Sequence, residues 1–135
     1  EAERMALREF GYNLGMAFQL VDDMLDYSAQ QATLGKTVGD DFREGKITLP
    51  VVLAFRAADA KGEAFWRRTL EDLSQKKGDF KRAVTLLEKS GALDATLERA
   101  RQYGVKASAA LADFEDGPIK EALLESVQFS IDRAH

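Results

Sequence analysis

The stretch GYNLGMAFQLVDDMLDY, residues 11–27, decides the fold class, because its apolar residues recur at the three- and four-residue steps of an α-helix. On a helical wheel these residues cover more than half of the circumference: Leu14, Ala17, Phe18, Leu20, Val21, Met24 and Leu25. A helix that is apolar over most of its surface is a buried helix. We therefore predict a buried helix, and the pattern extends it over residues 3–29.

The same helical period continues through most of the remaining chain. Thr48 is a candidate cap for the next helix, which has Pro50 in its first turn. The predicted helices cover residues 49–60, 62–77, 79–90 and 92–115, with a last helix from Pro118. Because the alternating pattern of β-strands is absent from the sequence, we predict an all-α fold.

Composition excludes several classes of function. The 135 residues include no cysteine and one histidine, His135, which excludes a thiolate zinc site and leaves no well-placed histidine for nucleophilic catalysis. The net charge of -4 argues against nucleic-acid binding, and no apolar run is long enough for a transmembrane segment. We expect a single-domain cytoplasmic protein. Because the helical pattern is already running at Glu1, we also expect the chain to be part of a longer protein.

A narrow polar strip runs along the helix that contains residues 11–27. It carries Gln19, Asp22, Asp23 and Asp26, and Gly15 lies one turn earlier, where it leaves room for a ligand. Neighbouring carboxylates on a helix repel one another, and burial favours their protonated forms unless a cation compensates. Mg²⁺ is the natural compensation because it prefers oxygen ligands. The alternative is an acidic helix face exposed to solvent.

Residues 30–47 interrupt the helical pattern, and we predict a loop with one short helical turn. Its glycines and basic residues are Gly35, Gly39, Gly45, Lys36, Arg43 and Lys46. Carboxylates that can hold a metal, followed by basic residues that can bind phosphate, are typical of a metal–diphosphate site. The alternative is that the two lysines are surface charges beside the acidic residues of the loop.

Two segments carry a resemblance to a known family: residues 11–27 and LGKTVGDDFREGKITLPVV, residues 34–52. They contain FQ, DDxxD, GKxxGxD and EGKxTLP in the order and spacing of the trans-polyprenyl diphosphate synthases. FSIDR, residues 129–133, resembles the closing helix of that family. The sequence of these segments is most similar to those of the bacterial octaprenyl and decaprenyl diphosphate synthases. The resemblance implies the C-terminal half of the isoprenoid synthase helical bundle, without the family's first aspartate-rich motif.

The resemblance also implies the site residues. Asp22 and Asp26 would ligate Mg²⁺, with Asp23 as a neighbouring or water-mediated partner. Lys36 and Lys46 would contact the diphosphate.

Further residues complete the implied substrate site. Gln19 would line the cavity near the reacting carbons and, with the two lysines, is a catalytic candidate. Asp41 would orient a lysine or a metal-bound water. Phe18 is included among the substrate-binding candidates, although core packing is the simpler interpretation of its ring. We also assign Tyr12, Tyr27 and Phe42 to packing.

The implied activity is prenyl chain elongation, in which isopentenyl diphosphate adds to an allylic diphosphate. The product would be a long-chain all-trans polyprenyl diphosphate, a precursor of the ubiquinone side chain, made by a homodimer. Because the first aspartate-rich motif is missing, the isolated chain is expected to be inactive. Two alternatives remain: a non-catalytic helical subunit of a heteromeric prenyl synthase, and a class I terpene cyclase. Trp66, Arg67 and Arg68 lie outside the motifs, and we expect a surface or interface role for them.

Overall fold

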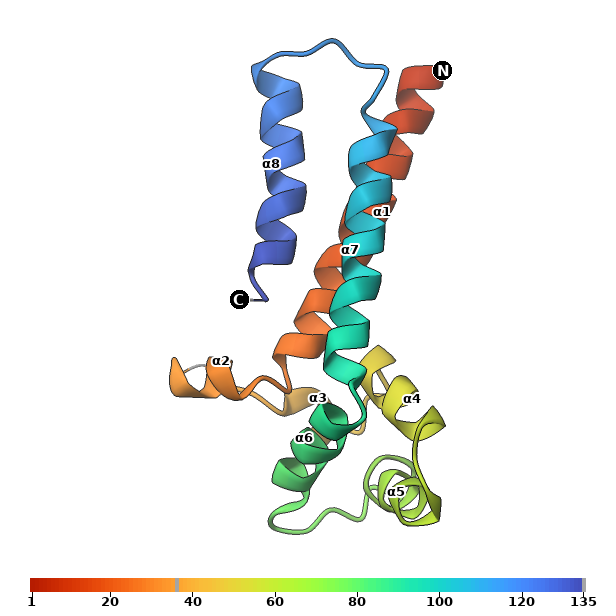
Figure 1. The fold of residues 1–135 in the computed structure, drawn as a ribbon, viewed down its shortest axis with the longest axis vertical. Helices are drawn as coiled ribbons and strands as arrows, with labels where there is room; N and C mark the ends of the chain where they lie inside the picture. Colours follow the sequence, from red (N-terminus) through yellow and green to blue (C-terminus); the bar gives the residue numbers. More distant parts are fainter. Residues whose placement is uncertain (36, 135) are drawn as a thin grey trace. The chain divides into compact units, whose positions relative to one another are not determined.

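The fold is helical in a computed structural model, which describes residues 1–35 and 37–134 (Figure 1). The predicted roles of Lys36 and His135 lie outside these ranges. Within them there is no β-strand, which confirms the all-α prediction. The elements are α1 (Ala2–Leu25), α2 (Ala29–Thr33), α3 (Asp40–Arg43), α4 (Leu49–Arg56), α5 (Ala60–Trp66), the π-helical η1 (Arg67–Glu71), α6 (Asp79–Lys89), α7 (Ala92–Ala110) and α8 (Pro118–Asp132). None of the helices described is both long and apolar enough to cross a membrane.

The chain divides into two compact units. The first unit contains Glu1–Asp22 and Leu97–His135, and the second contains Asp23–Thr96. In the first unit, α1 runs antiparallel to α7 and α7 runs antiparallel to α8 (Figure 1). Their shared core is formed by buried Phe10, Ala107, Leu111 and Val127. Each unit therefore has a hydrophobic core of its own.

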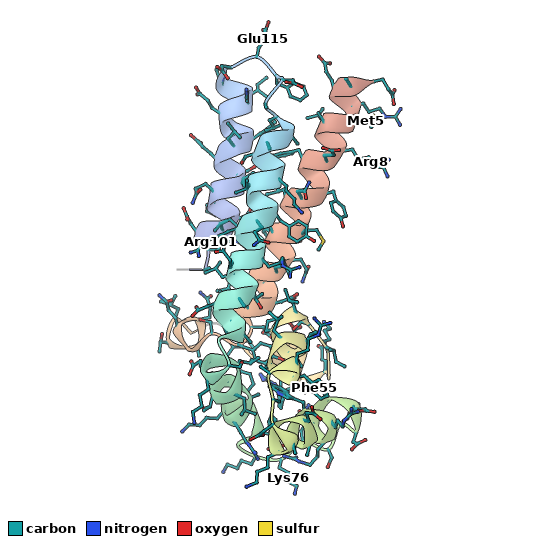
Figure 2. The ribbon with its side chains drawn as sticks, turned by 45° about the vertical axis from the view of Figure 1, so that its right-hand side comes forward. Met5, Arg8, Phe55, Lys76, Arg101 and Glu115 are labelled. Carbon is teal, nitrogen blue, oxygen red and sulfur yellow. The ribbon has the colours of Figure 1, made fainter. Side chains whose placement is uncertain are left out.

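One side of α1 is exposed, which corrects part of the packing prediction. Tyr12 is 64% exposed and Phe18 is 43% exposed, whereas Ala17 and Val21 are fully buried. Figure 2 shows Met5 and Arg8 on the same helix pointing away from α7 and α8. The physical reason is that α7 and α8 cover α1 from one side in this unit. The predicted core packing of Tyr12 and Phe18 is therefore wrong.

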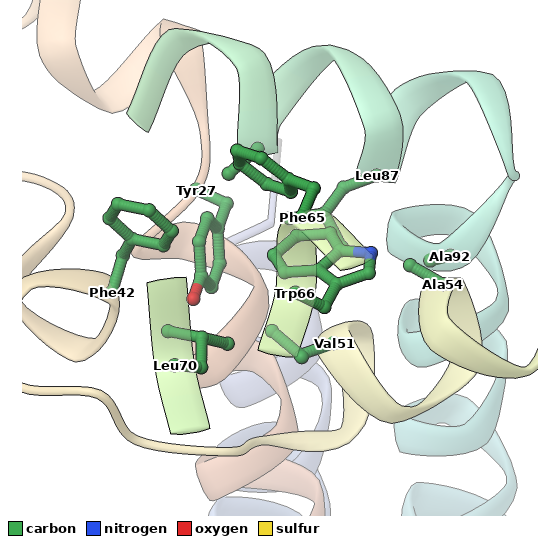
Figure 3. Packing of buried hydrophobic residues seen from close by; sticks show 10 residues of the cluster. Tyr27, Phe42, Val51, Ala54, Phe65, Trp66, Leu70, Leu87 and Ala92 are labelled. Carbon is green, nitrogen blue, oxygen red and sulfur yellow. The ribbon is translucent and has the colours of Figure 1, made fainter. Parts of the chain in front are cut away.

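The core of the second unit combines aromatic and aliphatic residues from several short helices and from the turn after α1 (Figure 3). Tyr27 and Phe42 are buried here, as predicted from the sequence. Trp66 is also buried and packs edge-on against Phe65, with a centroid distance of 5.2 Å. The expected surface role of Trp66 is therefore wrong, because α5 turns its indole inward against α4 and α6.

The predicted helix boundaries differ from the observed ones where turns replace helical hydrogen bonds. The first helix ends at Leu25, four residues early, because the N–H of Tyr27 bonds to the C=O of Met24 in a tight turn. The helix predicted over 62–77 ends as η1 and gives way to a connector, residues 72–78. The predicted loop over 30–47 contains two short helices, α2 and α3.

Candidate functional site

The carboxylate of Asp26, directly after α1, binds the backbone of the following loop. Its Oδ1 accepts a hydrogen bond of 3.1 Å from the N–H of Gly39, and its Oδ2 accepts one of 2.7 Å from the N–H of Asp41. The N–H of Gly39 also donates to the backbone C=O of Asp26 at 2.8 Å. Hydrogen bonds to an ionised carboxylate are about twice as strong as neutral ones. These hydrogen bonds connect the acidic segment to the GKxxGxD segment.

Gly39 is required by the geometry of this junction. Its φ of 87° lies in the left-handed region, which side chains other than glycine rarely adopt. A Cβ added there would lie 2.7 Å from Nη1 of Arg43 and 2.8 Å from the ring of Phe80. The glycine in the motif therefore serves the fold of the loop, in addition to any approach of a ligand.

Lys46 is held at the end of the same loop by two carboxylates. Its Nζ lies 3.0 Å from Oε2 of Glu44 and 3.7 Å from Oδ1 of Asp41. The hydrogen bond with Glu44 is the main reason that the pKa of Lys46 is raised, and the charges of Glu44 and Asp41 add to it. With 59% of its side chain exposed, Lys46 presents an ammonium group to solvent. It is therefore accessible to an anionic ligand.

Three carboxylates near Lys46 form an acidic cluster: Asp23, Asp26 and Asp41. Burial raises the pKa of Asp41, and the charges of Asp26 and Asp23 raise it further, whereas Lys46 opposes the effect. The pKa of Tyr27 is raised by burial first and then by the same three carboxylates. The Tyr27 hydroxyl is buried without a hydrogen-bond partner in the described part of the chain. Electrostatically, this cluster would be stabilised by a bound cation.

Asp22 has a different environment, in the first compact unit. Nη1 of Arg133 donates a hydrogen bond of 2.7 Å to Oδ1 of Asp22. Nη2 of the same arginine donates to the C=O of Phe18 at 3.0 Å, and the guanidinium lies 3.7 Å from the centre of the Phe18 ring. The exposed Phe18 ring thus serves as a platform for Arg133, a stacking arrangement typical of arginine.

The structure brings some of the predicted site residues together and separates others. Asp26, Asp41 and Lys46 form one contiguous group, and Asp23 acts on it electrostatically. Gln19 lies on the exposed side of α1. Over residues 1–35 and 37–134, no three acidic or histidine side chains are gathered closely enough to hold a metal. Two of the predicted ligands have other partners: Asp22 is bound by Arg133 and Asp26 by backbone N–H groups.

Two residues of this region were missed as site candidates from the sequence. Arg133 had a signal, because it ends the FSIDR segment that resembles the closing helix of the family. Gln75 had none: its amide donates to the C=O of Phe42 at 2.7 Å, from a connector without any motif.

Comparison with known proteins agrees with these motifs. The family model described as "Polyprenyl synthetase" matches residues 1–87. The octaprenyl diphosphate synthase of Haemophilus influenzae is 39% identical over 133 residues, which cover 98% of this chain and 40% of the relative. The octaprenyl diphosphate synthase of Escherichia coli is 37% identical over 131 residues. This chain therefore spans about 40% of the length of these curated relatives.

Solved structures of polyprenyl synthases are also similar to this chain. A polyprenyl synthase from Caulobacter crescentus, complexed with calcium and isoprenyl diphosphate, superposes with a TM-score of 0.90 at 49% identity. That match covers 99% of this chain and 41% of the other. A decaprenyl diphosphate synthase from Rhodobacter capsulatus has a TM-score of 0.93 at 41% identity, over 100% of this chain and 42% of the other.

Proposed function

Because this chain belongs to the polyprenyl synthetase family, we propose that it forms the part of a long-chain all-trans polyprenyl diphosphate synthase that carries the second aspartate-rich motif. The proposed reaction adds isopentenyl diphosphate to an allylic diphosphate. The observation that carries the proposal is the hydrogen bond of 2.7 Å between the Asp41 N–H and Asp26, which joins the acidic segment to the loop that presents Lys46. Anion-binding and cation-binding groups thereby become neighbours.

The proposed cofactor is Mg²⁺, because the proposed ligands are carboxylates, although in this structure Asp22 is bound by Arg133 and Asp26 by backbone N–H groups. Mg²⁺ takes hard oxygen ligands and is usually held by one or two carboxylates together with substrate phosphates and water. Asp22 and Asp26 would hold it, with Asp23 nearby, and the negative charges of Asp23 and Asp26 beside Asp41 are of the sign that a bound cation would neutralise. When bound, the ion would supply charge neutralisation for the departing diphosphate.

The chain's own residues then have distinct tasks. The Lys46 ammonium binds diphosphate oxygens, and its exposed side chain leaves it able to reach them. Asp41 orients that ammonium from 3.7 Å. Lys36 has the same proposed task as Lys46, and Gln19 and Phe18 line the substrate cavity. Preorganised cations of this kind favour departure of the diphosphate, because they meet its charge as that charge develops.

Other features of the family are part of the same proposal. The synthase would act as a cytoplasmic homodimer and would supply the side chain of ubiquinone. A complete site also requires the first aspartate-rich motif and a pocket for isopentenyl diphosphate, since both substrates must be held at reacting distance. The 135-residue chain by itself is therefore expected to give no elongated product.

A chimera tests this proposal directly. The chain replaces the aligned 42% of the Rhodobacter capsulatus decaprenyl diphosphate synthase, and the product is assayed with farnesyl diphosphate, isopentenyl diphosphate and Mg²⁺. We expect linear polyprenyl diphosphate, and a decrease in turnover of about 100-fold for Asp22→Ala, as for a lost electrostatic group. Asp94→Ala, which removes an exposed carboxylate of α7, is the matched control.

Two outcomes would contradict the proposal. A folded but inactive chimera would favour the non-catalytic subunit, and a cyclic hydrocarbon product would favour the terpene cyclase.

A further inference from the structure

We infer that Gln75 is a positioning residue for the diphosphate loop, defined here as residues 39–46, and that the connector 72–78 braces this loop. The inference rests on the proposed function, because it assigns the brace to the loop that carries Asp41 and Lys46. The connector lies between η1 and α6 in the sequence, and Figure 2 labels its residue Lys76.

The amide of Gln75 makes two hydrogen bonds, one to the nearby η1 and one to a distant segment of the sequence. Its Nε2 donates to the C=O of Phe42 at 2.7 Å and to the C=O of Thr69 at 3.0 Å. Both acceptors are backbone carbonyls, which fixes the orientation of the amide with its nitrogen towards them. Gln75 therefore joins the last turn of η1 to α3, inside the diphosphate loop.

Leu73 forms a second contact with the loop and adopts an unusual backbone conformation to do so. Its φ of 53° lies in the left-handed region, which is uncommon for a leucine. A Cβ on Gly45 would collide with Cδ2 of Leu73, so the leucine side chain lies directly against Gly45. Strained residues of this kind persist where the surroundings hold them in place. The connector thus touches the loop on both sides of Glu44.

The connector is itself anchored, so it can act as a rigid support. Arg68 donates to both carboxylate oxygens of Asp79, at 2.8 and 3.0 Å, and to the C=O of Ser74 at 2.7 Å. The N–H of Lys76 donates to Asp79 at 2.7 Å. Asp79 is buried, and bidentate pairs of this type have defined geometry. This pair fixes both ends of the segment that carries Gln75.

Phe80 extends the same support to the other end of the loop. Its ring lies 5.9 Å from the Phe42 ring and 6.0 Å from the Tyr27 ring, measured between centroids, and it lies against Gly39. Segment 73–80 therefore contacts the loop at Gly39, Phe42 and Gly45. Because Gly39 and Asp41 are the two donors to Asp26, a displacement of Phe42 would loosen the junction of the two motifs.

The experiment measures amide exchange by NMR in the ligand-free chain for wild type and Gln75→Met. Methionine keeps the length of the side chain and removes both donor bonds. We expect exchange at Gly39 and Asp41 to rise about tenfold, with no change at Leu87 and Ala107, since local opening is confined to the loosened segment. Gln102→Met on the exposed face of α7 is the matched control.

A second measurement connects the brace to the site: the dissociation constant of Mg²⁺–pyrophosphate should rise several-fold in Gln75→Met and stay unchanged in Gln102→Met. If exchange at Gly39 and Asp41 stays at the wild-type rate, or rises equally throughout the chain, the brace is refuted. If exchange rises but affinity is unchanged, the positioning role is refuted.

Absence of pyrophosphate binding by the wild type would count against the proposed function, and the exchange data would still decide the brace. Should Gln75→Met fail to fold, Leu73→Gly removes the other contact at a position where glycine fits the backbone. It should give the same increase confined to the loop, and an unchanged loop would overturn the inference.

Discussion

Arg133 and Asp22, 111 residues apart in the sequence, are joined by a hydrogen bond of 2.7 Å. The arginine comes directly after α8, and the aspartate is the first residue of the DDMLD segment on α1. A residue proposed to bind Mg²⁺ is therefore paired with a guanidinium. The guanidinium of Arg133 and a bound metal ion would compete to neutralise the same carboxylate.

Removal of this arginine should strengthen metal binding. In Arg133→Gln, Asp22 loses a competing positive charge, so we expect Mg²⁺ to bind several-fold more tightly in isothermal titration calorimetry. Arg101→Gln, which alters an exposed pair with Glu98, should leave the affinity unchanged. Weaker Mg²⁺ binding by Arg133→Gln would show that the arginine supports the metal ligand and does not compete for it.

Replacement of Asp26 should destabilise the protein. Repulsion among neighbouring carboxylates would predict a gain in stability, but Asp26 accepts two hydrogen bonds from loop N–H groups. We expect Asp26→Ala to lower the free energy of unfolding by about 2 kcal/mol, as for hydrogen bonds to a charged group. Urea denaturation measures this, with Asp40→Ala as the control because the Asp40 carboxylate makes a surface ion pair with Arg43. A stability of Asp26→Ala equal to or above that of the wild type would favour the repulsion argument.

Gly39→Ala should cost more stability than Gly78→Ala. Both glycines have a positive φ, 87° and 90°, so both variants pay about 1–2 kcal/mol for the left-handed backbone. A Cβ at Gly39 also meets Arg43 and Phe80, whereas nothing lies within 4 Å of one at Gly78. Overpacking adds about 1–3 kcal/mol to the first variant. If Gly39→Ala and Gly78→Ala lowered the Tm equally, the contacts of Gly39 with Arg43 and Phe80 would not add to the loss of stability.

The Arg68–Asp79 pair should give stability a specific pH dependence. Hydrogen bonds, chiefly from Arg68, lower the pKa of Asp79 to about 2, below the value of ~3.9 for an unfolded chain. The stabilisation is therefore complete above the unfolded pKa and is lost as the pH falls towards the folded one. Asp79→Asn should have a lower Tm than the wild type at pH 7, and the difference should shrink between about pH 4 and 2. Asp72→Asn, an exposed change in the same connector, should have the Tm of the wild type. If the Tm difference between Asp79→Asn and the wild type did not change with pH, the Arg68–Asp79 pair would not be its cause.

Sequence periodicity was sufficient to predict the helical class and the positions of most helices, because a buried face repeats along each helix. It could not predict which part of the apolar arc on α1 would be covered, since the exposure of Tyr12 and Phe18 depends on which helices pack beside them. The motifs predicted Asp26, Asp41 and Lys46 as site residues, but Gln75 and Arg133 contact the motif segments across 33 and 111 residues. Such long-range pairs leave no periodic signal in the chain.

The most direct test of the central claim, a metal-dependent diphosphate site at the junction of the two motifs, is titration of the chain with pyrophosphate in the presence and absence of Mg²⁺. We predict binding that requires Mg²⁺ and that weakens about tenfold or more in Lys46→Met, as expected when a charged contact is lost. Lys61→Met, which removes an exposed ammonium from α5, should retain the wild-type affinity. Pyrophosphate binding that is equally strong without Mg²⁺, or that Lys46→Met leaves unchanged, would contradict the claim.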